Sequence, residues 1–599
     1  MPVGLVAPNT AAGEFIARSA LLQSRARDLR WHVDSERQCA VGAGRVFVDD
    51  GFVCALDGEP RAAGSAIGIE RLVELIRKDP IAATSRLEGE FSLAFIDRAT
   101  SEVLVAIDKM GIGRATYATS ESLLAFSSNA LDVRSVVDAK VSNQAIHDFL
   151  FFHMVPSPQT VFDGISKLPL AHLLQWSPGQ GAQAQPYWQP KYADGPGAQH
   201  DLAAALNDAL GRAVRSAATP DCGAFLSGGL DSSTVAGYLA KVSDTPARTF
   251  SIGFGVPEYD ELKYARIAAS HFGCDATELN VTSSDIVESF EHIARQFDEP
   301  FGNSSVIPTY CCAKLAKEHG ITTMLAGDGG DELFGGNERY AKQRIFERYF
   351  LLPRAVRRGL IEPFANRFHP ELSPLPFRKL KSYVDQAQIR LPHRLVSWNF
   401  AFREGVDSLL DDDFAASVNK RSPHEHMQEV YDAFPSDEYL DRFLVYDWRI
   451  TLADNDLRKV GQMCDLAGVK VRYPMLDDAV VAMSTDVPPM LRMQGNKLRY
   501  FFKEAMRGFL PEAILTKPKH GFGLPFGVWL KDDASLRELV FSYLLDLKKR
   551  GMFKASFIDN LVDRHAGGHA SYFGYFIWDL AMLECWLSLH IDAQTGRSE

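Results

Sequence analysis

Two patterns of hydrophobic and polar positions divide the chain. Up to about residue 180, short runs of branched and aromatic residues alternate with turn residues, which is typical of β-strands. The segment EFSLAFIDRATSEVLVAID predicts one hairpin of this kind. After about residue 200, strand-like runs alternate with helical segments, which predicts a parallel sheet with helices on both faces. Residues 340–595 read as mostly helical.

The change of pattern predicts two domains. We expect an N-terminal domain over residues 1–180 and a C-terminal domain over residues 201–595. Between them, residues 181–200 are rich in Gly, Pro, Gln and Ala and lack a hydrophobic period, so they predict a linker.

Composition and charge narrow the class of protein. The 599 residues are 46% hydrophobic and 23% charged, as in ordinary globular proteins. The net charge of −12 disfavours a nucleic-acid partner, because such binders normally carry a basic stripe. The most hydrophobic stretch, 571–591, contains Asp579 and Glu584, so it predicts a buried helix, and we expect no membrane partner. Eight scattered cysteines and an N-terminus unlike a secretory signal lead us to expect a cytoplasmic protein.

The strongest local motif is SGGLDSS at residues 227–233, which follows a predicted strand and opens a predicted helix. Two glycines let the backbone approach a ligand closely, and free N–H groups at a helix start favour phosphate. Ser232 and Ser233 can cap the helix and donate to phosphate oxygens. Asp231 would repel phosphate unless a cation lay between them, so the motif implies Mg²⁺. The alternative is a serine-rich turn that only caps a helix.

A second glycine-rich turn, LAGDGGDELFGG at residues 325–336, follows another predicted strand. It carries Asp328, Asp331 and Glu332. Carboxylates beside a phosphate loop suit Mg²⁺ ligands or a base near a reacting centre. The alternative is a solvated acidic turn.

These two motifs resemble those of ATP pyrophosphatases, specifically the glutamine-hydrolysing asparagine synthetase family. The resemblance implies an α/β fold, with an N-terminal αββα amidotransferase-like (Ntn-type) domain. It also implies a C-terminal parallel-sheet ATP-pyrophosphatase domain with a helical extension. Four more strings resemble the same family in the same order: TFSIGF (249–254), FDEPFGNSSVIPTY (297–310), NDLRKVGQMCDLAGVKVRYPMLDD (455–478) and KHGFGLPFGVWL (519–530).

The resemblance implies a role for individual residues. Mg²⁺ would be bound by Asp231 and Asp331. Asp328 would support formation of an acyl adenylate, and Lys459 would stabilise charge on the reacting phosphate or the tetrahedral intermediate. Without the flanking strings, Lys459 would read as a surface helix lysine. The residues expected to contact ATP are Leu226, Ser227, Gly228, Gly229, Leu230, Asp231, Ser232, Ser233, Ile252, Ala326 and Gly327.

The implied reaction forms an amide. A small-molecule or peptide carboxylate, aspartate or a relative of it, attacks the α-phosphorus of ATP and releases pyrophosphate. Ammonia or an amine then attacks the acyl adenylate and expels AMP. Members of the family often form homodimers, so a second copy of the chain is an expected partner.

The N-terminal half departs from the family pattern at its reactive residue. Glutamine-hydrolysing members carry a cysteine at position 2, whereas this chain carries Pro2. The family's Asn-Gly-Glu glutamine clamp is reduced to Asp57-Gly58-Glu59. We therefore expect a glutaminase fold without glutamine hydrolysis, in which Asp57, Gly58 and Asp97 are remnants of the pocket.

Several functions stay open from the sequence. The nucleophile can be free ammonia, or an amine on the substrate itself as in β-lactam synthetases and lasso-peptide cyclases. A tRNA-modifying enzyme is disfavoured by the acidic charge. A non-catalytic scaffold or regulator is disfavoured because Asp231, Asp331 and Lys459 are all present.

Overall fold

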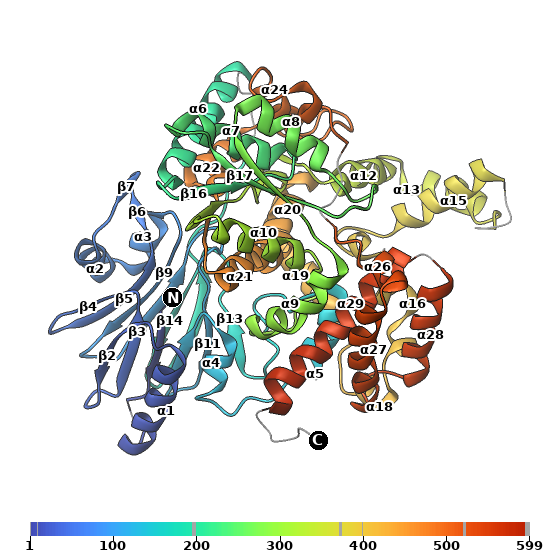
Figure 1. Ribbon diagram of the computed structural model, residues 1–599. Helices are drawn as coiled ribbons and strands as arrows, with labels where there is room; N and C mark the ends of the chain where they lie inside the picture. The colour runs from blue at the N-terminus through green and yellow to red at the C-terminus, as the bar shows by residue number, and fades with distance from the viewer. Residues whose placement is uncertain are drawn as a thin grey trace.

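The structure is a computed structural model that describes residues 2–8, 10–193, 199–369, 374–397, 399–518, 523–568 and 570–593. Figure 1 shows a β-rich N-terminal part beside a C-terminal part built on a smaller sheet and many helices.

Within the described ranges the N-terminal part contains two stacked antiparallel sheets of six strands each. The first sheet has the order β13-β11-β12-β1-β3-β2 and the second β15-β14-β10-β9-β5-β4. The strands of the first are β1 (Val3–Val6), β2 (Arg30–Asp34), β3 (Cys39–Ala43), β11 (Thr116–Thr119), β12 (Leu124–Ser127) and β13 (Ile165–Lys167). The strands of the second are β4 (Arg45–Val48), β5 (Phe52–Gly58), β9 (Phe91–Asp97), β10 (Val103–Ile107), β14 (His172–Ser177) and β15 (Gly181–Pro186).

Helices cover the outer faces of these two sheets and complete four αββα layers. Val105 and Trp176 lie in the core between the sheets, whereas Leu93 packs outward against Leu72 of α2. Because both faces are covered, β10 is buried along its whole length. The covering helices are α1 (Ala12–Arg25), α4 (Ala130–Arg134) and α5 (Asn143–Phe152) on the first sheet, and α2 (Ile69–Lys78) and α3 (Pro80–Ser85) on the second.

The predicted hairpin is confirmed, since β9 and β10 pair antiparallel. The predicted linker needs one correction. Residues 181–186 form β15, which pairs with β14 along its whole length. Sequence composition misses this strand because it lies at a sheet edge, where none of its residues is buried and its side chains need not be hydrophobic.

The C-terminal part is built on a five-stranded parallel sheet of the order β18-β17-β16-β19-β20. Its strands are β16 (Cys222–Phe225), β17 (Arg248–Gly253), β18 (Asp275–Asn280), β19 (Thr323–Leu325) and β20 (Lys470–Arg472). The alternation predicted from the sequence is confirmed, since helices connect these strands. They include α7 (Leu230–Val242), α8 (Leu262–Phe272), α9 (Ser283–Gln296), α10 (Val306–Glu318) and α11 (Gly330–Phe334).

The remaining chain is mostly helical. None of the helices in the described part combines the length and the hydropathy needed to cross a membrane. The other longer helices are α6 (Gln199–Ala217), α12 (Glu338–Glu347), α15 (Leu375–Gln388), α19 (Ser422–Asp432), α20 (Tyr439–Asp447), α21 (Arg458–Ala467), α22 (Asp478–Asp486), α27 (Ala534–Lys549), α28 (Ala555–Gly567) and α29 (Ala570–Leu587).

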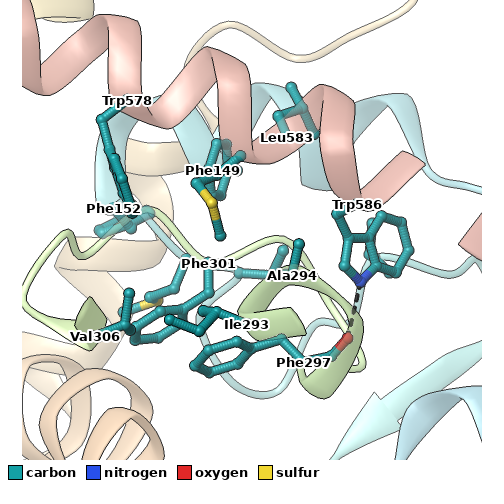
Figure 2. Packing of buried hydrophobic residues seen from close by; sticks show 14 of the residues in the cluster. Phe149, Phe152, Ile293, Ala294, Phe297, Phe301, Val306, Trp578, Leu583 and Trp586 are labelled. Carbon is teal, nitrogen blue, oxygen red and sulfur yellow. Dashed lines mark hydrogen bonds between the residues drawn. The ribbon is translucent and has the colours of Figure 1, made fainter. Parts of the chain in front are cut away.

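The two parts share one hydrophobic core around α29, the helix that the sequence predicts to be buried. Figure 2 shows Phe149 of α5 packed among residues of α29 and the segment after α9. Trp586 Nε1 donates to the carbonyl oxygen of Phe297 at 3.0 Å. The two acidic groups of α29 are paired, Asp579 with His153 at 2.7 Å and Glu584 with Arg550. Pairing explains how a buried helix holds two carboxylates.

A buried ion cluster also joins the two parts. Arg458 donates to Asp298 at 2.5 Å and to Glu299 at 2.6 Å. Glu299 also accepts from Lys167 of the N-terminal part at 2.9 Å, and Asp298 accepts from the backbone N–H of Ala130 at 2.7 Å. Burial by itself would raise the pKa of Asp298, but Arg458 and Arg114 hold it below its ordinary value.

Replacing Arg458 by Leu should strongly destabilise the protein, because it would leave two buried carboxylates without their main partner. We expect a loss of about 3–5 kcal/mol in the free energy of unfolding, measured by chemical denaturation. The matched control is Arg71→Leu, which removes an exposed ion pair with Glu74 and should change stability by less than about 1 kcal/mol. Equal effects of the two substitutions would contradict the importance of this cluster.

Candidate active site

The two glycine-rich turns lie side by side at the carboxyl ends of two neighbouring strands of the parallel sheet. β16 and β19 are neighbours, and each is followed directly by one of the turns. From β16 the chain proceeds outward through β17 to β18, whereas β19 leads to β20 on the other side. The strand order therefore reverses between β16 and β19, and open parallel sheets bind ligands in the crevice that forms at such a point. A cavity of about 620 Å³ opens there.

The first turn supplies one wall of this cavity. Leu226, Ser227 and residues 229–232 line it. The hydroxyl groups of Ser227 and Ser232 lie 3.0 Å apart, and the N–H of Gly229 donates to Ser227 Oγ. The first N–H groups of α7 have no partner within the helix, so this wall suits an anion.

The other residues predicted to contact ATP divide into two groups. Ile252 and Gly327 line the cavity. Gly228 packs against the backbone of α8, and Ser233 and Ala326 are buried behind the wall. These last three support the turn from behind.

Asp231 of the first turn and Asp331 of the second meet at Arg499. Nη1 of Arg499 lies 2.7 Å from Asp231 Oδ2 and 3.0 Å from Asp331 Oδ1, and Nη2 also pairs with Asp231. Arg499 is 4% exposed and precedes α24 (Tyr500–Ala505). Its guanidinium holds together two carboxylates that would otherwise repel one another.

Two glycines of the second turn leave the room that this triad needs. A Cβ on Gly330 would lie 2.0 Å from Asp231 Oδ1, and a Cβ on Gly336 would lie 1.9 Å from Asp331 Oδ1. Either side chain would push a carboxylate out of its place. The glycines of LAGDGGDELFGG therefore serve close approach of acidic side chains as well as the turn itself.

A second set of charged groups lines the same cavity. Lys459 of α21 donates to Asp456 at 2.7 Å. Burial opposes the charge of Lys459, but Asp456 and Asp328 outweigh it and raise its pKa, so it is protonated at neutral pH. Burial raises the pKa of Asp328 to about 6, against the attraction of Lys459. Burial and then the charge of Asp331 raise the pKa of Glu332 well above its ordinary value.

The residues present fit Mg²⁺ and phosphate. Among the described residues, no group of three or more His, Cys, Asp or Glu side chains forms a metal site by itself. Mg²⁺ usually takes one or two carboxylates and completes its shell with water and substrate phosphates. Asp231 and Asp331 supply two carboxylates beside the anion-binding wall, in agreement with this coordination preference of Mg²⁺.

Comparison with known proteins agrees with the geometry. The family model for asparagine synthase matches residues 202–588. The chain belongs to the asparagine synthase family. The model for the glutamine amidotransferase domain matches residues 42–188.

Individual relatives cover most of the chain. It is 24% identical to asparagine synthetase (glutamine-hydrolyzing) 1 of Bacillus subtilis (strain 168), over 85% of this chain and 79% of the relative. It is 25% identical to a putative asparagine synthetase (glutamine-hydrolyzing) of Mycobacterium bovis, over 92% of this chain and 81% of the relative. It is 22% identical to amidase chry2 of Gibberella zeae, over 82% of this chain and 77% of the relative.

The other family-like strings surround the cavity or its supports. Asn303 and Ser305, from the string at 297–310, line the cavity. The string at 455–478 contains Lys459 and strand β20. Residues 519–522 of the last string lie outside the described residues, and its remainder leads into α26 (Phe526–Asp532).

A second cavity, of about 800 Å³, lies between the amidotransferase-like domain and the synthetase domain. Asp57 and Gly58, which the sequence analysis assigns to a former glutamine pocket, are among the residues that line it. Asp57 Oδ1 accepts from the backbone N–H of Gly44 at 3.1 Å. Ion pairs cross between the domains around its rim: Glu59 with Arg472 at 3.0 Å, Arg61 with Asp477 at 2.6 Å and Lys109 with Asp478 at 2.7 Å.

The structure separates Asp97 from this cavity. Asp97 pairs with Phe52 at one end of β5, whereas Gly58 pairs with Phe91 at the other end, roughly 20 Å away. Asp97 instead accepts from backbone N–H groups in the β9–β10 turn. The buried acidic group that lines the cavity is Asp108, whose pKa is raised by burial to about 6.

Three polar residues of these sites were missed by sequence reasoning. Asp108 directly follows β10 and precedes a glycine-rich turn, which is a usable signal. Asp456 lies three residues before Lys459, so helical spacing predicts their contact. Arg499 lies 268 residues from Asp231 along the chain, and no local pattern announces their pairing.

Replacing Gly330 by Ala should disable the site without unfolding the protein. The new Cβ would displace Asp231, and a shift of this size lowers the turnover of a positioned site by about a hundredfold. The measurement is ATP-dependent pyrophosphate release, with circular dichroism to show retained structure. Gly13→Ala is the matched control, because its Cβ would meet nothing within 4 Å. Full activity of Gly330→Ala would contradict the assigned geometry.

Proposed function

We propose that this chain is an ATP- and Mg²⁺-dependent amide synthetase. It activates a carboxylate, aspartate or a related compound, as an acyl adenylate and transfers the acyl group to ammonia or an amine. The observation that carries this proposal is the meeting of both glycine-rich turns with Lys459 around one cavity at the reversal point of the sheet. The ATP dependence of the family, and its C–N ligase chemistry, support it.

Attack at the α-phosphorus requires the β- and γ-phosphates to leave as one unit. The wall formed by residues 227–232 and the start of α7 would grip that pyrophosphate. Mg²⁺ bound at Asp231 and Asp331 would neutralise the leaving group. Arg499 already pairs with both carboxylates, so it would keep them oriented before substrates bind.

Lys459 and Asp328 have complementary roles in this proposal. Lys459 is a fixed, buried cation, which stabilises charge that develops during reaction more than an exposed cation would. Asp328 lines the same cavity, and a carboxyl group with a pKa of about 6 can accept a proton from an amine near neutral pH.

The nitrogen would enter from the synthetase side rather than from glutamine. No cysteine is among the described residues that line the interdomain cavity. Cys39 and Cys54 are buried in strands, where burial raises the pKa of each to about 12, so neither is a ready thiolate. Around α21, Asp456 and Lys459 face the synthetase cavity, while Arg458 lines the interdomain one. The segment therefore forms a charged wall between the cavities.

An intramolecular amide former is the second candidate. The same wall favours it, because an amine carried by the substrate needs no path from the other domain. A cytoplasmic location also belongs to the proposal, since all eight cysteines are free and such chains suit a reducing compartment.

Pyrophosphate release with aspartate should separate these cases. We expect release with ATP, Mg²⁺ and ammonium, and no asparagine formation with glutamine as the sole donor. Lys459→Met should lower turnover by about 100- to 1000-fold, while Lys470→Met, an exposed lysine on β20, should not. No release with aspartate under any condition would move the search to carboxylates that carry their own amine. No ATP-dependent release with any such carboxylate would favour a non-catalytic scaffold.

Activity should also fall in acid, because Asp328 must be ionised to accept a proton. Since burial raises its pKa to about 6, Asp328 becomes neutral as the pH drops through that value. A plot of the rate of amide formation against pH should show a limb near pH 6, and Asp328→Asn should be slower and lack that limb. Asp456→Asn serves as the comparison, since it should slow the reaction through Lys459 yet keep the limb. Persistence of the limb in Asp328→Asn would assign it to another group.

A further inference from the structure

One helical segment carries an unusual share of the exposed hydrophobic side chains. We define residues 344–369 and 374–381 as the basic arm; residues 370–373 are not part of it, because they lie outside the described residues. Eight of the eighteen exposed large hydrophobic side chains found in the described part of the chain belong to it. They are Ile345, Leu351, Leu352, Val356, Leu360, Phe364, Leu375 and Phe377. Scattered exposed leucines are normal, but a concentration of this kind marks an interaction surface.

The exposed side chains form an ordered stripe on the arm. Val356, Leu360 and Phe364 are spaced by four residues along α13 (Arg354–Val356), η2 (Arg357–Ile361) and α14 (Glu362–Ala365), so they lie along one side. Leu351, just before α13, is 82% exposed, and Leu360 is 68% exposed.

The arm is nevertheless a folded unit. Phe368 stacks on Phe377 with ring centroids 4.3 Å apart, and Tyr349 donates to Glu362 at 3.0 Å. Ala365 is fully buried, and so is Val384, which lies just beyond the arm in α15. The outward leucines are therefore presented by a built scaffold and are not a frayed end.

Positive charge is concentrated in the basic arm. The basic arm contains nine Lys and Arg and two Glu, a net charge of +7, in a chain whose total is −12. The remaining chain therefore carries −19. Arg354 and Arg358 are exposed beside the apolar stripe. Outward leucines and phenylalanines flanked by arginines are the features of a surface that lies on an anionic membrane.

We propose that the basic arm docks this protein on the surface of an anionic lipid bilayer. In Figure 1, α13 and α15 lie at the far right, projecting away from both sheets. A bilayer accepts a projecting apolar surface without a matching groove, whereas a folded protein partner would have to supply one. The anionic bilayer repels the rest of the chain, which is acidic, and this repulsion turns the arm toward the lipid.

The docking would be peripheral and is compatible with the absence of a spanning helix from the described residues. Docking of this kind depends on separate exposed side chains, and these do not form a long hydrophobic run in the sequence. The arm begins in the last turn of α12, and the first residue of that helix, Glu338, lines the synthetase cavity. Docking would therefore bring that cavity near the membrane.

Vesicle flotation of the full chain tests the proposal. We expect binding to vesicles of phosphatidylcholine mixed with phosphatidylglycerol to exceed binding to phosphatidylcholine alone by about tenfold, and to weaken as salt rises. A Leu351→Gln/Leu360→Gln double variant and an Arg354→Gln/Arg358→Gln double variant should each lose about tenfold in binding.

Matched controls on the body are Leu545→Gln and Arg71→Gln, at an exposed leucine and an exposed arginine outside the arm. Both should bind vesicles like the unmodified chain, and every variant should retain pyrophosphate release in solution. No vesicle binding, or binding that the arm variants leave unchanged, would overturn the proposal. A second result would also overturn it: sedimentation velocity shows a dimer, the leucine double variant dissociates this dimer, and no vesicle binding is seen. The arm would then contact a second copy of the chain.

Discussion

The ion cluster of Arg458 with Asp298 and Glu299 is the interaction on which the arrangement of the two domains depends. Its charges are almost completely buried, so each requires its partner. Arg458 is the first residue of α21, and the next residue is Lys459, which faces the synthetase cavity. Glu299 and Asp298 in turn accept hydrogen bonds from the N-terminal domain. One cluster thus fixes the position of a site lysine and of the domain interface together.

This coupling gives the N-terminal domain a structural role in the synthetase half, whatever reaction the domain itself supports. Asp298 and Glu299 need donors from residues 130, 161 and 167 of the N-terminal domain. The hydrophobic core around α29 is also shared, because Phe149 and Phe152 pack against it. The amidotransferase-like domain therefore contributes to the stability and the geometry of the synthetase half through these contacts.

The active site depends on buried charge that is balanced locally. Arg499 balances Asp231 and Asp331, and Lys459 balances Asp456 and Asp328. Burial and the neighbouring carboxylates, Asp331 first, raise the pKa of Glu332 well above its ordinary value. Carboxyl groups in one cavity therefore differ in environment: Asp231 and Asp331 lie against a guanidinium, whereas burial raises the pKa of Asp328 and Glu332.

The sequence by itself determined the two-domain α/β fold, the hairpin of β9 and β10, and the placement of SGGLDSS and LAGDGGDELFGG after strands. These features depend on local periodicity and on turn residues that lie close together along the chain. Only the tertiary structure decided that Arg499 joins Asp231 to Asp331, that Asp108 rather than Asp97 faces the interdomain cavity, and that residues 181–186 add an edge strand. Strand register and pairing between distant segments decide such contacts, and a one-dimensional pattern does not contain them.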